Sequence, residues 1–155
     1  MSVAFRRDGD EEHLEPKFEL PIPPGPNLVT PRGRKLIDER VVALEARIAE
    51  LAVDAELEAV RRDLRYWQTR QVTAELAPAP NGETVQIGTR VEILLNGKPR
   101  RLSIVGHDEA EPAQDRLAYA APLSRALIGA EAGDVLAFGQ RADAIEVLAI
   151  EVADD

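Results

Sequence analysis

Four acidic residues, Glu50, Asp54, Glu56 and Glu58, fall close together in the first half of the chain. Carboxylates are ordinary ligands of Mg²⁺, which proteins hold through one or two of them plus water and other oxygens. At the end of a projecting element, they could carry a metal-assisting group into the active site of another enzyme. The alternative is local: Asp54 would cap a helix, and acids in a first turn favour the helix dipole. The helix-terminating interpretation is favoured, and Asp54 and Glu56 remain candidate tip residues.

Other residues capable of catalysis are sparse. The chain contains two histidines, His13 and His107, and no cysteine, which excludes disulfides, thiolate zinc sites and iron–sulfur clusters. Neither histidine has a partner at metal-ligand spacing. His107 precedes Asp108 and could act as a base, but a polar loop between strands is the favoured interpretation. We therefore expect no catalytic residues, no metal site of the chain's own, no cofactor and no enzyme activity.

Charge and composition indicate which class of partner, nucleic acid, protein or membrane, the chain can bind. The segment Arg61–Trp67, RRDLRYW, could stack on nucleic acid bases, but Trp67 also falls on an apolar helical stripe, so packing is favoured. The formal net charge of -9 argues against tight binding to a phosphate backbone and suits a basic protein surface. With no apolar run of transmembrane length and no signal-peptide segment, we expect a cytoplasmic protein without membrane contact.

The acidic cluster must be carried by helices. Thr30 is a good N-cap and Pro31 suits the first helical position, although Gly33 weakens the first turn. Two heptad-spaced apolar stripes follow. They allow either one continuous helix of over 40 residues or an antiparallel hairpin turning near residues 52–55, and we favour the hairpin because a single helix would expose both stripes. The stripes are Ile37, Val41, Leu44, Ile48 and Leu51, then Leu57, Val60, Leu64 and Trp67.

Beyond the prolines at positions 78 and 80, the apolar period changes to two, which is typical of strands. The fold class is α+β: an antiparallel coiled-coil hairpin at residues 28–77, then a small, mainly antiparallel sheet domain at residues 81–155. Asn96-Gly97 is a strong hairpin-turn signal, and one short helix spans residues 122–128. Residues 1–27 form a proline-rich flexible tail or an extended strip. The expected strands are residues 90–95, 100–105, 117–121, 135–138 and 145–152.

Three stretches carry a family resemblance: TPRG at Thr30–Gly33, IVGHDEAE at Ile104–Glu111 and APLSRALIGAEAGDVL at Ala121–Leu136. Together they resemble the GreA/GreB family of bacterial transcript cleavage and elongation factors, whose signature is Ser-Pro-(Leu/Ile)-x-Arg-Ala-Leu-(Leu/Ile)-Gly-x-x-x-Gly-Asp. The similarity covers roughly residues 27–152 and is weakest across the hairpin. It implies an FKBP-like C-terminal domain that docks on the rim of the RNA polymerase secondary channel, and a hairpin that enters the channel.

The resemblance also implies a docking surface on the loop and the short helix. Two differences affect it. Ala121 replaces the family's serine before the proline, which removes a helix cap worth about 1 kcal/mol. Ala118 and Ala120 replace small polar or acidic residues, which makes the contact more apolar or weaker. The implied docking residues are His107, Asp108, Glu109, Pro122, Leu123 and Arg125.

The hairpin departs further from the family. Nothing matches its tip, approximately Gly-Asp-Leu-Ser-Glu-Asn-Ala-Glu-Tyr, and Asp54 and Glu56 correspond to it by position alone. The arms are also shorter than in cleavage factors. In this the chain resembles the Rnk-type branch of the family, which binds polymerase with a shortened hairpin. We therefore expect a monomeric, non-enzymatic regulator that binds bacterial RNA polymerase at the secondary channel. Any nucleic acid contact would occur indirectly, within the transcription complex.

The resemblance leaves two other functions open. The alternative is an active cleavage factor, whose Asp54 and Glu56 would support RNA hydrolysis by the polymerase and share the Mg²⁺ of its active site. An FKBP-like peptidyl-prolyl isomerase comes last. Such enzymes need an aromatic-lined pocket, and residues 81–155 contain only two aromatic residues, Tyr119 and Phe138.

Overall fold

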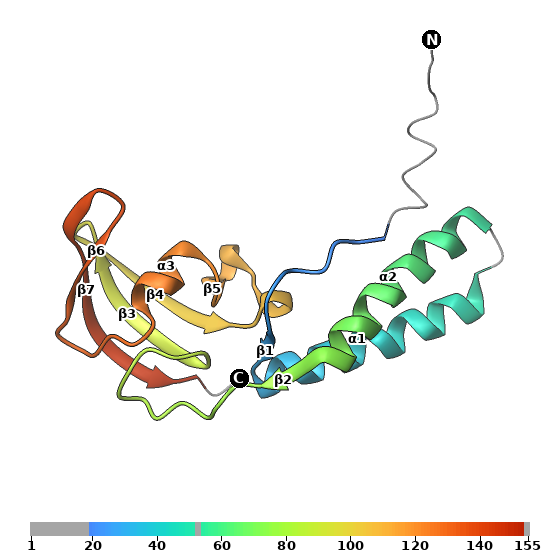
Figure 1. Ribbon diagram of the computed structural model, residues 1–155, viewed down its shortest axis with the longest axis horizontal. Coiled ribbons are helices and arrows are strands. Elements are labelled where there is room, and N and C mark those ends of the chain that lie inside the picture. Colours follow the sequence, from blue (N-terminus) through green and yellow to red (C-terminus); the bar gives the residue numbers. More distant parts are fainter. Residues whose placement is uncertain (1–18, 52–53, 154–155) are drawn as a thin grey trace, which may run out of the picture. The chain divides into compact units, whose positions relative to one another are not determined.

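The computed structural model describes residues 19–51 and 54–153 of the chain (Figure 1). Their contacts define two compact units. The hairpin unit contains residues 19–24 and Ile37–Val72, and the sheet unit contains Gly25–Leu36 and residues 73–153. The sequence had placed all of residues 28–77 in the hairpin, whereas the start of the first helix groups with the sheet.

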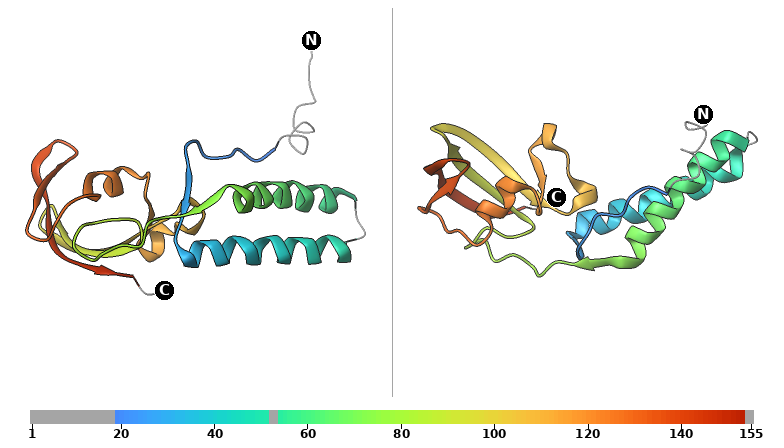
Figure 2. Two further views of the ribbon diagram at one scale, coloured as in Figure 1. Left: turned by 60° about the horizontal axis from the view of Figure 1, so that its bottom comes forward. Right: turned by 45° about the horizontal axis from the view of Figure 1, so that its top comes forward.

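Two helices form the hairpin, α1 (Pro31–Glu50) and α2 (Asp54–Thr73), each 20 residues long. Figure 2 shows them side by side. Contacts between their facing residues establish the direction: the Gln71 amide donates to the Asp38 carboxylate at 3.0 Å near one end, and Arg47 pairs with Glu56 at 3.9 Å near the other. The antiparallel hairpin is therefore confirmed and the continuous helix is excluded. Of the predicted turn, residues 52–53 lie outside the described residues.

The predicted stripes form the hairpin interface. Ile37, Val41 and Val60 are buried, and the remaining stripe residues are half-buried. Arg70, whose burial the sequence does not predict, is also buried, with its guanidinium 6.0 Å from the ring centre of Tyr66. The apolar contact is therefore fullest at Ile37 and Val41, far from the turn, and becomes more open along the arms.

Part of the proline-rich segment lies on the hairpin as an extended strip. The Arg65 guanidinium on α2 donates two hydrogen bonds to the Glu19 carboxylate, at 2.7 and 2.8 Å. This agrees with the extended alternative for residues 19–24. The rest of the predicted tail, residues 1–18, lies outside the described residues.

A short parallel pair that the sequence did not predict joins β1 (Asn27–Val29) to β2 (Ala74–Leu76). Asn27 is buried, and its amide donates to the Thr73 hydroxyl at 3.2 Å. Three-residue strands have too little period to be recognised in a sequence. The predicted boundary between tail and hairpin runs through this pair.

The second sheet has the order β5-β4-β3-β7-β6. Its pairs are antiparallel, as expected for most of the sheet, except that β5 runs parallel to β4. Asn96 and Gly97 turn between β3 and β4 with φ of 52° and 83°, which confirms the predicted hairpin turn. The strands are β3 (Thr89–Leu95), β4 (Lys98–Val105), β5 (Arg116–Ala118), β6 (Val135–Phe138) and β7 (Arg141–Val152).

One face of this sheet forms the core together with the short helix α3 (Pro122–Leu127). Alternating residues such as Val91 and Ile93 are fully buried, and Leu123 and Leu127 of α3 pack with them. Every buried residue of this cluster lies between Val85 and Val147. The predicted α+β class is confirmed. Among the described residues, no helix is long and apolar enough to cross a membrane.

Candidate functional site

Among the side chains that the structure describes, the acidic residues near the turn form no metal-binding group. Glu50 is exposed at the end of α1, and Glu56 is exposed on α2, where it pairs with Arg47 at 3.9 Å. Asp54 is the first residue of α2, and its side chain is not among those described. Within the described part of the chain, no group of three or more acidic or histidine side chains is placed to hold a metal ion.

The structure separates the six implied docking residues by exposure. His107, Pro122 and Arg125 are exposed and Asp108 is half-buried. Glu109 and Leu123 are only 2% and 7% exposed, so their side chains offer little surface to a partner. Leu123 belongs to the apolar core, because α3 turns this position toward the sheet. The loop residues form the 3-10 helix η2 (His107–Glu109), which packs against β5, and the chain reaches α3 soon after β5.

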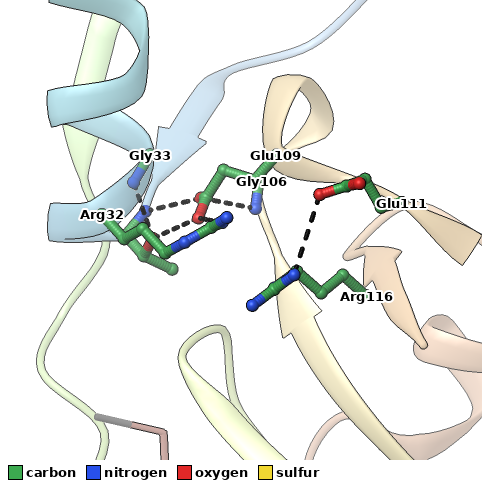
Figure 3. Close-up of polar contacts among 7 residues, drawn as sticks. Arg32, Gly33, Gly106, Glu109, Glu111 and Arg116 are labelled. Carbon is green, nitrogen blue, oxygen red and sulfur yellow. Dashed lines mark hydrogen bonds and ion pairs between the residues drawn. The ribbon is translucent and has the colours of Figure 1, made fainter. Parts of the chain in front are cut away.

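Glu109 instead joins two of the family-like stretches, TPRG and IVGHDEAE, as Figure 3 shows. Its carboxylate accepts hydrogen bonds from the Thr30 hydroxyl at 2.6 Å, the Thr30 N–H at 3.3 Å and the Gly106 N–H at 3.1 Å. The Arg32 guanidinium lies 3.5 Å away. The Thr30 hydroxyl in turn accepts from the Gly33 N–H at 3.0 Å, as an N-cap does. We call these five residues the Glu109 clamp.

The glycines of the clamp allow the close approach. A Cβ atom at Gly33 would collide with the Glu109 carboxylate, and one at Gly106 would lie 2.6 Å from the Leu28 carbonyl oxygen. A buried carboxylate is costly unless it is paired and hydrogen-bonded. Here it meets several donors and the positive end of the α1 dipole. Gly33, which costs about 1 kcal/mol in a helix interior, is explained by this contact.

Thr30 was predicted from the sequence as an N-cap, whereas its partner Glu109 was not predicted. The one signal in the sequence was Gly33, because a destabilising glycine in the first turn of a well-capped helix indicates that another group approaches the backbone closely there. The partner lies 79 positions away, and nothing in the local pattern predicts such a pairing. The clamp holds the start of α1 against η2 and is a structural contact, since Glu109 is buried.

Besides the exposed His107, the implied surface is accessible on α3. Ala121 has the extended backbone of an N-cap, with φ of -65° and ψ of 148°, but supplies no capping side chain. Pro122 follows at the first helical position, exposed beside Arg125. Ser124 is fully buried, and among the described residues its hydroxyl has no hydrogen-bond partner. The exposed face offered here is therefore small: a proline and an arginine.

Comparison with known proteins places these features in a family. Residues 79–153 match the family described as "Transcription elongation factor, GreA/GreB, C-term". The chain is 31% identical over 131 residues to "Transcription elongation factor GreB" of Neisseria meningitidis, covering 82% of this chain and 68% of that protein. It is 30% identical over 134 residues to "Transcription elongation factor GreA" of Roseiflexus, covering 79% of each chain.

Other matches are partial. "Transcription elongation factor GreA" of Methylococcus capsulatus is 36% identical over 104 residues, 59% of this chain and 66% of that protein. The chain thus spans slightly less than two thirds of that relative, and 35% of the Nitratidesulfovibrio vulgaris GreA. The solved structure of "GreA factor homolog 1 (Gfh1)" of Thermus thermophilus aligns with a TM-score of 0.39 and 20% identity, over 82% of this chain and 99% of that one. The matches to GreB and GreA over more than two thirds of their length show that the chain belongs to the GreA/GreB family of transcription elongation factors.

Proposed function

We propose that this chain is a non-enzymatic elongation regulator that binds bacterial RNA polymerase at the secondary channel as a monomer. The sheet unit would dock on the channel rim, and the hairpin would enter the channel. The observation that carries the proposal is the family match over residues 79–153, which include the exposed start of α3.

Hairpin length bears on what the protein does in the channel. Each 20-residue arm spans about 30 Å at 1.5 Å per residue. Relative to cleavage factors with longer arms, a loss of two to four turns would withdraw the tip by roughly 10–20 Å. Bonds from Mg²⁺ to oxygen are only about 2.1 Å long, so a side-chain rotamer cannot absorb such a deficit. We therefore propose that the chain occupies the channel but supports RNA cleavage weakly or not at all.

The proposed docking of the sheet unit on polymerase is tested by substituting Arg125, the exposed arginine of α3. Arg125→Glu reverses a charge on the proposed contact without touching the core, because Arg125 is exposed. We expect polymerase affinity, measured by co-purification and fluorescence anisotropy, to fall about tenfold. The matched control is Arg141→Glu, at an exposed arginine on β7. Unchanged affinity of a folded Arg125→Glu variant would remove this surface from the proposed site.

The second candidate is an active cleavage factor. One observation favours it: Glu56 is exposed near the turn, and its distance of 3.9 Å from Arg47 leaves only a loose ion pair. Such a carboxylate could be presented to a metal in another protein.

A backtracked transcription complex distinguishes the two candidates. RNA cleavage is measured with the wild-type chain and with Asp54→Ala/Glu56→Ala, with Glu39→Ala/Glu45→Ala, at exposed acids of α1 outside the cluster, as a control for lost acidic charge. We expect cleavage no faster than the polymerase alone for all three. Rapid cleavage by the wild type, lost only in Asp54→Ala/Glu56→Ala, would establish the cleavage factor and refute the proposal.

A further inference from the structure

The sheet unit contains an open cavity of about 440 Å³ that the proposed function does not use. Apolar side chains line most of it and come from the end of β2 and the segment after it, from the chain before β3, and from the ends of β4 and β7. Among them are Leu76, Ile87, Val105 and Val152. Leu76 and Val152 are about half exposed, 53% and 47%. The volume lies within the ~300–1,000 Å³ typical of small-molecule pockets, which are mostly apolar with a few placed polar groups.

Among the described residues that line this cavity, two arginines are the cationic groups. Arg32 reaches it from α1 and Arg116 from β5, and the two are drawn together in Figure 3. Glu109 also lines the cavity, but the clamp supplies its carboxylate with hydrogen-bond donors. The cavity therefore combines an apolar interior with guanidinium groups at two of its walls.

A smaller, polar hollow of about 300 Å³ adjoins the cavity, and Ser103 and Arg116 line both. The register of the strands explains why these side chains lie together. Arg90 on β3 pairs with Ser103 on β4, which pairs with Arg116 on β5, so the three side chains form one row on one face. Arg101 lies two residues before Ser103 on β4, on that same face, and also lines the hollow. Three arginines thus line the hollow with Ser103, in a chain whose net charge is -9. Asp115 also lines it, and its carboxylate pairs with Arg100 at 3.0 Å.

We propose that these adjoining hollows form a binding site for a small amphipathic anion with a linear apolar body and a carboxylate or phosphate head. The body would occupy the apolar cavity, and the head would meet Arg116 and its neighbours in the row. Guanidinium groups favour such heads because they donate paired hydrogen bonds to carboxylate and phosphate oxygens. A nucleotide fits less well: none of the described lining residues is aromatic, so a base would have no ring to stack on.

Carboxylates of the chain now hold these arginines. Glu151 accepts from Arg90 at 3.3 Å and from Arg101 at 3.2 Å, and Glu111 lies 3.7 Å from Arg116. Both acids are more than half exposed. Exposed ion pairs contribute little to stability, about 0–1 kcal/mol, so a ligand head that also buries its apolar body can replace them. Glu151 therefore competes with the ligand for the arginines. Removing its charge should strengthen ligand binding, whereas removing an arginine should weaken it.

The test titrates the full-length, isotope-labelled chain with octanoate and follows backbone and methyl chemical shifts. We expect saturable shifts at Ile87, Val105 and Val152. Octyl phosphate should act likewise and shows which head is preferred. Octanol and octylamine should bind at least tenfold more weakly, because they lack the anionic head. Acetate and inorganic phosphate should also bind at least tenfold more weakly, because they lack the body.

Variants then separate the two parts of the site. Arg116→Gln should weaken octanoate binding about tenfold, while Arg141→Gln, at an exposed arginine outside both hollows, should leave it unchanged. Glu151→Gln should tighten binding at least threefold by removing the competing carboxylate. Val152→Asp, at a half-exposed position on the cavity lip, should abolish it.

Four outcomes would overturn the proposal. The first is the absence of a saturable shift with either anionic probe. The second is equal binding of octanol or octylamine, which would mean an apolar site without a head group. The third is weaker binding in Glu151→Gln, because that carboxylate would then support the site instead of competing. If the lining residues responded only to added polymerase, the cavity would be a protein contact and the small-anion assignment would be wrong.

Discussion

Glu109 connects two segments that are 79 positions apart in the chain. Its carboxylate is buried against the N-terminus of α1, where Thr30 and Gly106 supply donors and the helix dipole favours a negative charge. Hydrogen bonds to a charged group each contribute about 1.5–3 kcal/mol, more than neutral ones. These hydrogen bonds stabilise the fold only because all the partners are in place, since a buried carboxylate without them would be strongly unfavourable.

The first prediction concerns this carboxylate. Glu109→Gln should lower the free energy of unfolding by about 1.5–3 kcal/mol, because the amide keeps the shape but loses the charge that the donors and the dipole stabilise. Chemical denaturation of the full chain measures the change. Glu111→Gln, at the exposed neighbouring acid, is the matched control and should stay within about 0.5 kcal/mol of wild type. Equal unfolding midpoints for the two variants would show that the clamp adds no stability.

The second prediction concerns the start of α3. Ala121 already has the extended backbone of an N-cap and lacks only the hydroxyl. Ala121→Ser should therefore raise the free energy of unfolding by about 1 kcal/mol, the usual worth of such a cap. Ala120→Ser places the same hydroxyl one residue earlier, at an exposed position, and should have no effect. A melting temperature that does not rise in Ala121→Ser would mean that the hydroxyl does not reach the helix N–H groups.

At the scale of elements, the strip at residues 19–24 adds a third segment to the two-helix hairpin unit. Leu20 and Pro23 are half-buried, and the Glu19–Arg65 pair anchors the strip to α2. The Arg65 hydrogen bonds hold the pKa of the Glu19 carboxyl below its usual value, with the nearby positive charges of Arg65 and Arg62 adding to the effect. The pair is exposed, so salt weakens it.

The third prediction is a pH dependence of this strip. Because Glu19 has a lowered pKa in the folded chain, its contact contributes above the usual glutamate pKa, ~4.3. The contribution is lost as the pH falls through the lowered pKa. Arg65→Gln should raise the pKa of Glu19 toward the usual value, as measured by carboxyl carbon NMR titration. Arg61→Gln removes an arginine that pairs with Glu58 and serves as the control. An unchanged Glu19 titration in Arg65→Gln would show that the pair does not form in solution.

At the scale of the whole molecule, the apolar core lies within a single stretch of the chain, whereas the Glu109 clamp joins two stretches that are far apart in the sequence. The buried cluster lies between Val85 and Val147, entirely within the predicted domain at residues 81–155. The clamp needs Thr30, which lies outside that domain. A fragment of residues 81–155 would therefore keep its core but leave Glu109 without the Thr30 donors and the α1 dipole.

The fourth prediction follows from this division. The 81–155 fragment should melt cooperatively but be less stable than the same region in the full chain. Residues 28–80 should be helical and only marginally stable alone, because two short arms bury little surface. Glu109→Gln, which destabilises the full chain, should be neutral or stabilising in the 81–155 fragment. A random-coil fragment would refute the domain boundary, and an equal loss in both contexts would refute the Thr30 contact.

The sequence by itself determined the elements whose signals are local. Heptad spacing from Ile37 predicted the arms, alternation at Val91 and Ile93 predicted the central strand, and Asn96-Gly97 predicted the turn, because each pattern repeats within a few residues. It also placed the implied docking residues along the chain without showing which of them are buried. Tertiary structure alone decided that Leu123 faces the core and that Glu109 caps α1 through Thr30. It also decided that β1 and β2 pair and that arginines from three strands meet at Ser103. These arrangements depend on contacts between distant segments and on strand register, which no local period specifies.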